Sequence, residues 1–332
     1  MHCELIVPGL FAEAADTRAP ALELLLARGR GTNGESHSVE SWLQEAFGLE
    51  DAPIAAGALT LVANGTDPGG ACWARADPVH LRLLRDRLIV VPGAAFELTA
   101  AEAHALVDAL NGHFAGALHL QATDAYRWCL RLEDPLAFHS VPPIEAAGRD
   151  VDLTARIGGE AGKRWKQVLT EAQMLLHAHP VNQAREEHGL PAVNSLWLWG
   201  AGSAPAVPAG RWRTVAATDP LPLGLARLGG ARALALPPDG AAWLGALPAE
   251  GRHLAVLDEL RAPLALGHTA ELHDLIGVLE TRWFAPLLAA LRAGRVGMVS
   301  VHVPDNVGAS FEVVRGDLRR FWRRRKALAS YA

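Results

Sequence analysis

Cysteine is scarce in this sequence, and its few residues are far apart. The 332-residue chain has three cysteines, Cys3, Cys72 and Cys129, and none of them belongs to a CxxC pair. Closely spaced cysteines hold structural zinc, and an even set of cysteines marks the disulfide framework of small secreted domains. Both classes are excluded, and we expect a reducing, cytoplasmic compartment.

Long hydrophobic runs and targeting signals are also missing. No stretch of roughly 18 apolar residues, the usual minimum for a membrane-spanning helix, occurs in the sequence. The first residues, MHCELIVPGLF, have neither the basic region nor the apolar region of a secretory signal. We therefore predict a soluble protein with no transmembrane segment. The net charge of −5 provides no overall attraction to nucleic acid.

The common catalytic and metal-binding motifs do not occur. The sequence has no GxSxG nucleophile elbow, no GxxxxGK[ST] phosphate loop and no HExxH zinc motif. His177 and His179 are two residues apart near the end of a predicted helix, where their side chains point to different faces. His268, His273 and His302 likewise have no recognised ligand spacing. We expect no metal site and no cofactor.

What the sequence does contain is a large apolar fraction and a regular alternation of elements. Half of the residues are hydrophobic, which is ample for one large core or for two lobes. Strands alternate with helices through the second half of the chain, a pattern typical of an α/β sheet that is at least partly parallel. The richness in Ala, Leu, Arg and Gly suits a bacterial, GC-rich genome.

A different pattern lies between these regions. A helix over 99–114 begins with the capping box of Thr99 and Glu102, and two strands that read as a hairpin follow it. This patch is too small for an independent domain and indicates an inserted lobe. We predict a mostly parallel sheet flanked by helices in residues 1–85 and 151–332, with a small inserted α+β lobe at 86–150.

The segment RADPVHL, residues 75–81, is a first candidate site. It connects two predicted strands, 57–65 and 85–93. Arg75, Asp77 and His80 beside a proline-fixed turn have the character of a ligand-orienting loop. The alternative is that Asp77 caps a short helix that begins at Pro78.

The segment HPVNQAREEHGLPAVNSLWLWGAG, residues 179–202, is a second candidate site. It combines a short helix, a Gly-Leu-Pro stop and a strand with two tryptophans. Arg185 has the geometry to bind an anion bidentately. Alternatively, the asparagines bond to backbone while the tryptophans fill the core. The candidate ligand-binding residues here are His179, Asn182, Arg185, Asn194, Trp197 and Trp199.

The segment GDLRRFWRRRKAL is the one strongly basic stretch. Asp317 reads as the N-cap of a terminal helix, with cations from Arg319 to Lys326 and an apolar stripe that includes Phe321 and Trp322. Such a helix suits nucleic acid or anionic lipid. It suits equally a helix docked on this acidic protein's own surface.

Residues 179–202 resemble the HPVN…R…G…PAN…WG.G signature of archaeal-type, cofactor-independent phosphoglycerate mutases. They resemble the bacterial RpfE-type regulatory proteins more closely, together with ADPVHL (76–81), GRDVD (148–152), NSLWLWG and GDLRRFWRR in the same order. The mutases belong to the alkaline phosphatase superfamily. The resemblance implies an alkaline-phosphatase-like α/β core with a smaller inserted domain, two metal ions and a serine nucleophile.

The catalytic parts of the mutase pattern are not matched. The first strand is followed by Pro8 and Gly9 where the mutases have an Asp-Gly metal motif, and GTNGES is a faint echo of their nucleophile region. Near the end, Asp305 and Gly308 align with a metal motif whose histidine is replaced by Ala309. Two-metal phosphoryl chemistry needs a full ligand set, so we expect mutase activity to fail.

Two hypotheses follow. The first is a non-catalytic regulatory or binding protein, a pseudoenzyme on a mutase-like frame, whose partner is an anionic small molecule or a protein. The second is a phosphomutase or phosphatase that acts on a small phosphorylated metabolite. Its site is either a metal site or a rearranged site built from Arg75, His80, His179 and Arg185.

Overall fold

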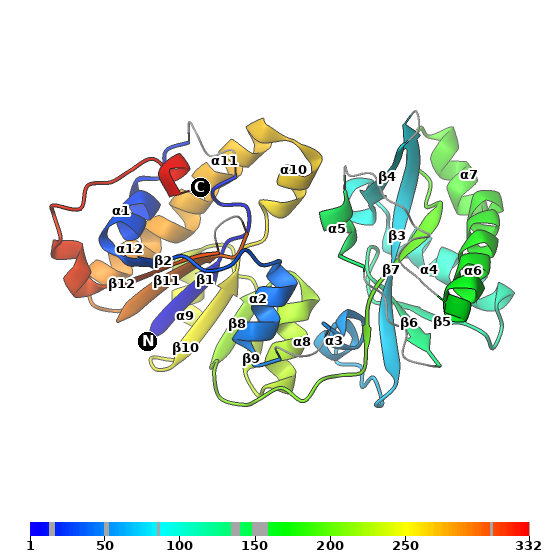
Figure 1. Ribbon diagram of the computed structural model, residues 1–332, viewed down its shortest axis with the longest axis horizontal. Coiled ribbons are helices and arrows are strands. Elements are labelled where there is room, and N and C mark those ends of the chain that lie inside the picture. Colours follow the sequence, from blue (N-terminus) through cyan, green and yellow to red (C-terminus); the bar gives the residue numbers. More distant parts are fainter. Residues whose placement is uncertain are drawn as a thin grey trace. The chain divides into compact units, whose positions relative to one another are not determined.

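The structure is a computed structural model that describes residues 1–12, 17–49, 53–84, 87–133, 140–147, 159–305 and 308–331. The chain divides into two compact units. Unit 1 comprises Met1–Glu50 and Ala206–Ala332, and unit 2 comprises Asp51–Pro205. Each unit has its own sheet (Figure 1). The GRDVD segment lies outside the described residues.

Unit 1 contains a seven-stranded sheet with the order β2-β12-β11-β1-β10-β8-β9. Five neighbouring strands from β11 to β9 are parallel, and β12 and β2 are added antiparallel at one edge. The mostly parallel α/β fold class is thereby confirmed. The strands are β1 (His2–Ile6), β2 (Arg30–Thr32), β8 (Thr214–Ala217), β9 (Arg232–Ala235), β10 (Arg252–Val256), β11 (Met298–Val303) and β12 (Ala309–Val314).

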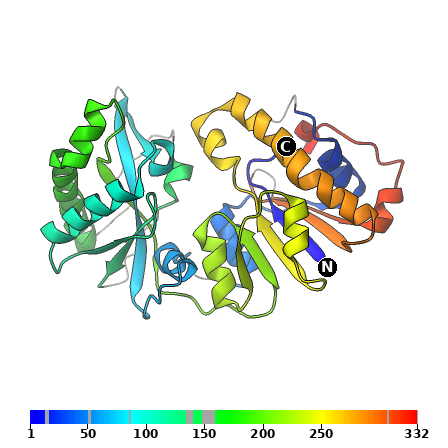
Figure 2. The ribbon, with the colours of Figure 1, turned by 180° about the vertical axis from the view of Figure 1, so that it is seen from behind.

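Helices cover both faces of this sheet, as the two opposite views show (Figures 1 and 2). Helices α1, α9, α11 and α12 supply buried residues to one core with β1, β10 and β11. On the other face, α2 places Trp42 against His302 of β11, with the ring centroids 5.1 Å apart. The helices are α1 (Pro20–Arg28), α2 (Val39–Ala46), α8 (Pro220–Leu228), α9 (Gly240–Ala246), α10 (Arg261–Leu266), α11 (Thr269–Leu279) and α12 (Ala285–Arg292).

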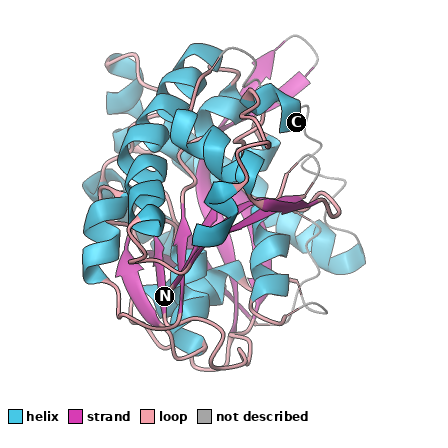
Figure 3. Ribbon diagram, turned by 90° about the vertical axis from the view of Figure 1, so that its left-hand side faces the viewer, coloured by secondary structure: helices cyan, strands magenta, loops and turns pink. Residues whose placement is uncertain are grey.

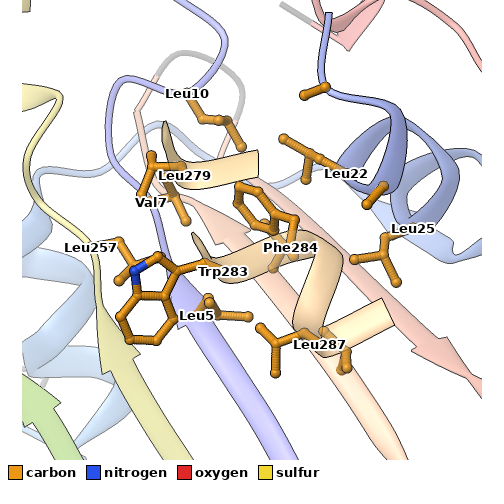
Figure 4. Close-up of a cluster of buried hydrophobic side chains, with 14 of the residues drawn as sticks. Leu5, Val7, Leu10, Leu22, Leu25, Leu257, Leu279, Trp283, Phe284 and Leu287 are labelled. Carbon is orange, nitrogen blue, oxygen red and sulfur yellow. The ribbon is translucent and has the colours of Figure 1, made fainter. Parts of the chain in front are cut away.

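The core follows from alternation along β1. Leu5 and Val7 are fully buried and point toward Trp283 and Phe284, which lie in a π-helical turn between α11 and α12 (Figure 4). Burial of each such side chain stabilises the fold by roughly 1.5–3 kcal/mol. The helical run from α11 to α12 is continuous and changes its winding at Glu280–Phe284.

The opposite face of β1 carries a buried carboxylate. Glu4 is 1% exposed and is bonded bidentately by Arg252 of β10, at 2.6 and 3.0 Å. His302 of β11 lies on its other side, with Nε2 3.4 Å from Glu4 Oε2. Burial alone raises the pKa of Glu4, but His302 and Arg252 outweigh burial and lower the pKa to about 2. Glu4 thus links three adjacent strands.

Unit 2 is an antiparallel sheet with helices against it (Figure 1; Figure 3 colours helices and strands separately). Its long central strand β3 pairs with β4, β6 and β7, and β5 extends the sheet beyond β6. The strands are β3 (Cys72–Leu84), β4 (Arg87–Pro92), β5 (His119–Ala122), β6 (Trp128–Leu132) and β7 (Ser195–Gly202). The helices are α3 (Ala56–Ala63), α4 (Ala100–His113), α5 (Pro143–Ala146), α6 (Gly159–Ala178) and α7 (Pro180–Glu187).

Unit 2 is wider than the lobe that we predicted at 86–150. Strand β7, which sequence alternation assigned to the α/β core, pairs instead with β3 along Val79–Ser195 to Trp73–Gly202. Long-range strand pairing of this kind leaves no local signal in the sequence. The predicted helix 99–114 and its hairpin are present, with the Thr99–Glu102 capping box formed.

Three local predictions were wrong. Residues 57–65 form most of helix α3 rather than a strand, because a short, wholly buried apolar run does not distinguish the two. Asp77 lies within β3 and caps no helix, since pairing with β7 extends the strand through Pro78. The basic C-terminal segment forms a short 3-10 turn at Arg315–Arg319 and then a loop instead of an amphipathic helix.

None of the described helices is long and apolar enough to cross a membrane.

Gly57 shows how closely α3 packs on the sheet of unit 2. A Cβ at this position would lie 2.6–2.7 Å from backbone atoms of Ala74 in β3. We expect Gly57→Ala to lower the free energy of unfolding by about 1–3 kcal/mol or more, because backbone cannot move aside cheaply. Gly112→Ala in α4, where nothing lies within 4 Å of the new Cβ, is the matched control. It should be neutral or stabilising by up to about 1 kcal/mol. Urea unfolding of both variants tests this, and equal effects would contradict it.

Candidate functional site

The nine predicted site residues all lie in unit 2, and the structure divides them among separate networks. In the first network, Arg75 and Asp77 form a buried ion pair with Nη2 and Oδ1 2.7 Å apart. Trp199 of β7 donates its indole N–H to Asp77 Oδ2 at 2.8 Å, and Arg75 also donates to Thr60 Oγ1 at 3.3 Å. The guanidinium stacks over the Trp199 ring. Burial raises the pKa of Asp77, against the opposing effect of Arg75.

Arg185 and Asn182 form a second network on α7. Arg185 is 2% exposed and donates to Glu102 Oε1 at 2.9 Å and to the backbone carbonyls of Pro191 and Phe96. Asn182 is fully buried, and its amide bonds to the carbonyls of Leu176 and Val193 and to the Val193 N–H. The side chains that we proposed for anion recognition therefore tie α7 to its surroundings.

The remaining candidates are also engaged by their own chain. His80 Nδ1 lies 2.8 Å from the carbonyl of Ala192, and Asn194 exchanges two hydrogen bonds with the backbone of Leu81. Trp197 donates to the carbonyl of Val141 at 2.8 Å. His179 is the N-cap of α7 and accepts from Val181 N–H, and burial lowers its pKa.

The structure does not bring together the four residues of the predicted rearranged site. Arg75 is held by Asp77, His80 by Ala192, and Arg185 by Glu102. His179 is held by the backbone of its own helix. These polar side chains instead form hydrogen bonds with the backbone and with one another, so their role in the structure is to hold the fold together.

A second group of polar residues lies in unit 1, at the carboxyl ends of the parallel strands. Ligands of open α/β sheets bind outside these ends. Strands β8, β10, β1 and β11 are neighbours there, and an aspartate follows three of them. We name this group the carboxyl edge: Asp219 after β8, Asp258 after β10 and Asp305 after β11.

Asp258 is the most perturbed of these groups. Burial first, and then the negative charge of Asp219, raise the pKa of Asp258 to about 6, against the positive charge of Arg261. A carboxyl that titrates near neutrality because of burial and a neighbouring charge is typical of functional sites. Asp219 also caps α8 by accepting from Leu221 N–H at 2.9 Å.

The other acidic groups beside this edge have partners from their own chain. Asp305 Oδ2 accepts from Gly9 N–H, in the turn after β1, at 2.8 Å. Its Oδ1 is buried without a hydrogen-bond partner among the described residues, and burial raises its pKa. Glu40 of α2 forms an ion pair with Arg261 at 3.1 Å.

Helix α2 begins beside the same edge. The His37 N–H donates to the carbonyl of Pro304 after β11, and Ser38 caps the helix by accepting from Ser41 N–H at 3.1 Å. A hollow of about 340 Å³ is lined by His37, Ser41, Gln44 and Glu45.

The residues at the edge do not fit a pair of metal ions. Across the part of the chain that the structure describes, no three His, Cys, Asp or Glu side chains stand close enough together to hold a metal. One oxygen of Asp305 and one of Glu40 are already committed, to Gly9 and Arg261. We therefore derive no step through a metal.

Sequence analysis missed this edge as a site, although a signal was present. Asp258 and Asp305 each follow a predicted buried strand within two residues. In the sequence, Asp305 belongs to the incomplete metal motif, and Asp258 matches no motif. The rule that carboxyl ends of parallel strands converge would have grouped the two.

Comparison with known proteins gives distant relatives. No family model matches the chain. A 2,3-bisphosphoglycerate-independent phosphoglycerate mutase of Methanosarcina barkeri is 30% identical over 34% of this chain and 29% of its own length. A probable mutase of the same name from Geobacter sulfurreducens is 27% identical over 44% of this chain and 37% of its own. The chain is distantly similar to cofactor-independent phosphoglycerate mutases. It matches well under half the length of these relatives.

A solved structure supports the fold over most of the chain. The PH0037 protein of Pyrococcus horikoshii superposes with a TM-score of 0.60, covering 94% of this chain and 87% of its own. The sequence identity is 14%, so the similarity concerns the fold.

The Arg75–Asp77 pair provides a test of the structural role that we assign to the first network. Asp77→Ala leaves a guanidinium and an indole N–H buried without their acceptor, so we expect the free energy of unfolding to fall by about 3–5 kcal/mol. The control is Glu133→Ala, which removes an exposed carboxylate 3.7 Å from Arg164. It should cost about 1 kcal/mol or less. Chemical unfolding measures both, and a stable, fully folded Asp77→Ala protein would argue that this network is not structural.

Asp258 gives a pH-dependent prediction. Its pKa is raised from 3.8 to about 6 on folding, so its charge opposes folding above that range and has no effect below about pH 4, where both states are protonated. We expect Asp258→Asn to stabilise the protein at pH 8 by up to about 3 kcal/mol, and hardly at all at pH 4. Asp274→Asn on the exposed face of α11 matches the charge change. A pH-independent difference between the two variants would refute the raised pKa of Asp258.

Proposed function

We propose that this chain is a non-catalytic regulatory or binding protein built on a phosphoglycerate-mutase-like frame. The resemblance of its sequence segments to RpfE-type regulatory proteins agrees with this role. The parallel sheet retains the frame, and the carboxyl edge of unit 1 is the surface at which a ligand binds.

The observation that carries the proposal is how the acidic groups at this edge are used. In the mutases the first strand leads into a metal-binding Asp-Gly, whereas here Pro8 and Gly9 follow β1 and the Gly9 N–H holds Asp305. Arg261 holds Glu40 in the same way. Side chains fixed by internal hydrogen bonds and ion pairs are not free to stabilise a phosphoryl transition state.

The chemistry of the edge changes the ligand that we expect. The sequence predicts anion binding by Arg185. In the structure the Arg185 guanidinium donates its hydrogen bonds to Glu102 and to backbone carbonyls of unit 2, so it is not free to bind an anion. The negative charge of Asp258 favours instead a ligand or partner group that donates hydrogen bonds or carries positive charge, as does the second carboxylate oxygen of Asp305, which is buried without a hydrogen-bond partner among the described residues.

A phosphoryl-transfer enzyme is the second candidate. Its support is the name shared by the distant relatives, together with the pKa of Asp258 near 6, which suits a general acid or base. On this alternative the reacting groups lie at the carboxyl edge, and not among the four residues of unit 2 that we first considered.

One experiment on the full chain distinguishes the binding protein from the phosphoryl-transfer enzyme. The protein is purified after manganese and zinc supplementation, and its metal content and phosphoglycerate mutase turnover are measured together. We expect no stoichiometric metal and no turnover. Two metals per chain with turnover that Asp258→Asn abolishes and Asp274→Asn leaves unchanged would overturn the proposal in favour of the enzyme.

A further inference from the structure

The C-terminal loop of unit 1 exposes large aromatic side chains among cations. We define the basic loop as residues 319–327. Phe321 is 78% exposed and Trp322 is 66% exposed, and the two rings contact each other. The cations of this loop are Arg319, Arg320, Arg323, Arg324, Arg325 and Lys326.

The first part of the loop is fixed to the end of α1. Arg320 forms an ion pair with Asp317 at 2.7 Å and donates to the carbonyl of Arg28 at 3.2 Å. Arg323 donates to the carbonyl of Gly29 at 2.6 Å. These carbonyls belong to the last turn of a helix, where positive charge is favoured. Two of the six cations thus hold the loop.

The chain is fixed again directly after the loop. Leu328 is fully buried in the core of unit 1. Tyr331 stacks on Phe11 with the centroids 5.8 Å apart and meets Phe311 edge-on at 5.5 Å. Both opposite views show this segment, drawn in red, passing along the outside of unit 1 next to α1 (Figures 1 and 2). The loop is therefore a fixed projection rather than a free tail.

The position of the aromatic pair follows from these attachments. Arg320 and Arg323 point back to α1, while Phe321 and Trp322 between them remain exposed. Arg324, Arg325 and Lys326 are exposed beside them. Water is a poor surrounding for two adjacent aromatic rings, and exposed apolar groups rimmed by charge mark interaction sites.

We propose that the basic loop binds the surface of an anionic lipid bilayer. Aromatic side chains prefer the level of the lipid headgroups, where their apolar rings and polar edges are both satisfied. Each arginine or lysine near an anionic bilayer strengthens binding about fivefold. Neither contribution alone gives stable attachment, and the loop combines both. This proposal does not rest on the function proposed for the carboxyl edge.

The geometry of the rings favours lipid over single-stranded nucleic acid. Proteins that bind single strands present open aromatic faces on which successive bases stack. Phe321 and Trp322 lie edge to face, with centroids 5.4 Å apart and planes at 81°, so the two rings do not form a parallel platform for successive bases. Insertion into a headgroup layer needs exposed ring surface and no such platform.

Flotation of the full chain with lipid vesicles tests the proposal. We expect binding to vesicles of phosphatidylcholine with phosphatidylglycerol at low ionic strength, and at least about tenfold weaker binding to phosphatidylcholine alone or at high ionic strength. The double variants Phe321→Ala/Trp322→Ala and Arg324→Gln/Arg325→Gln should each weaken binding about tenfold or more. Both change exposed side chains only.

A charge-matched control separates the loop from the protein as a whole. Arg292→Gln/Arg295→Gln alters two exposed arginines elsewhere in unit 1 and gives the same net charge as the loop variant. It should bind vesicles like the unaltered chain. Absence of vesicle binding at low ionic strength, or equal losses in both arginine pairs, would overturn the proposal. Binding of a single-stranded oligonucleotide in place of vesicles would assign the loop to nucleic acid instead.

Discussion

The buried carboxylate of Glu4 is the constraint on which the parallel sheet of unit 1 depends. A charge in the interior is tolerated only with partners at hydrogen-bonding distance. Arg252 on β10 donates two hydrogen bonds to Glu4, and Nε2 of His302 on β11 lies 3.4 Å from Glu4 Oε2. Slipping either strand by one residue would turn these partners to the opposite face. The buried charge therefore favours the observed register, as does the alternation that buries Cys3 and Leu5.

The register of β1 with its two neighbouring strands determines which residues meet at the carboxyl edge. With β1 paired from His2 to Ile6 on both sides, Gly9 meets Asp305, and Asp258 follows β10 beside Asp219. The same strand alternation that sends Leu5 and Val7 into the core places Glu4 on the polar face. Fold and candidate site are consequences of one strand.

The two units use their polar residues differently. In unit 2, Asp77, Asn182 and Arg185 complete internal networks whose donors and acceptors are matched, so they specify packing. In unit 1, Asp258 keeps a charge that burial and Asp219 disfavour, and the basic loop keeps two aromatic rings in water. A charge or an exposed aromatic pair that lowers the stability of the fold, and that no contact within the chain compensates, is expected where the protein binds another molecule.

Local patterns were sufficient for the α/β class, the Thr99–Glu102 cap and the hairpin after it, because each depends on residues near one another in the chain. They failed for residues 57–65, whose apolar run suits a helix or a strand, and for Asp77, which only the distant pairing of β3 with β7 places inside a strand. Long-range contacts also explain why the candidate site lies elsewhere than the sequence predicts. The sequence suggests that Arg185 binds an anion, but in the structure Arg185 forms an ion pair with Glu102, 83 positions earlier. Only tertiary structure brings such partners together, since a contact between distant residues leaves no periodicity in the chain.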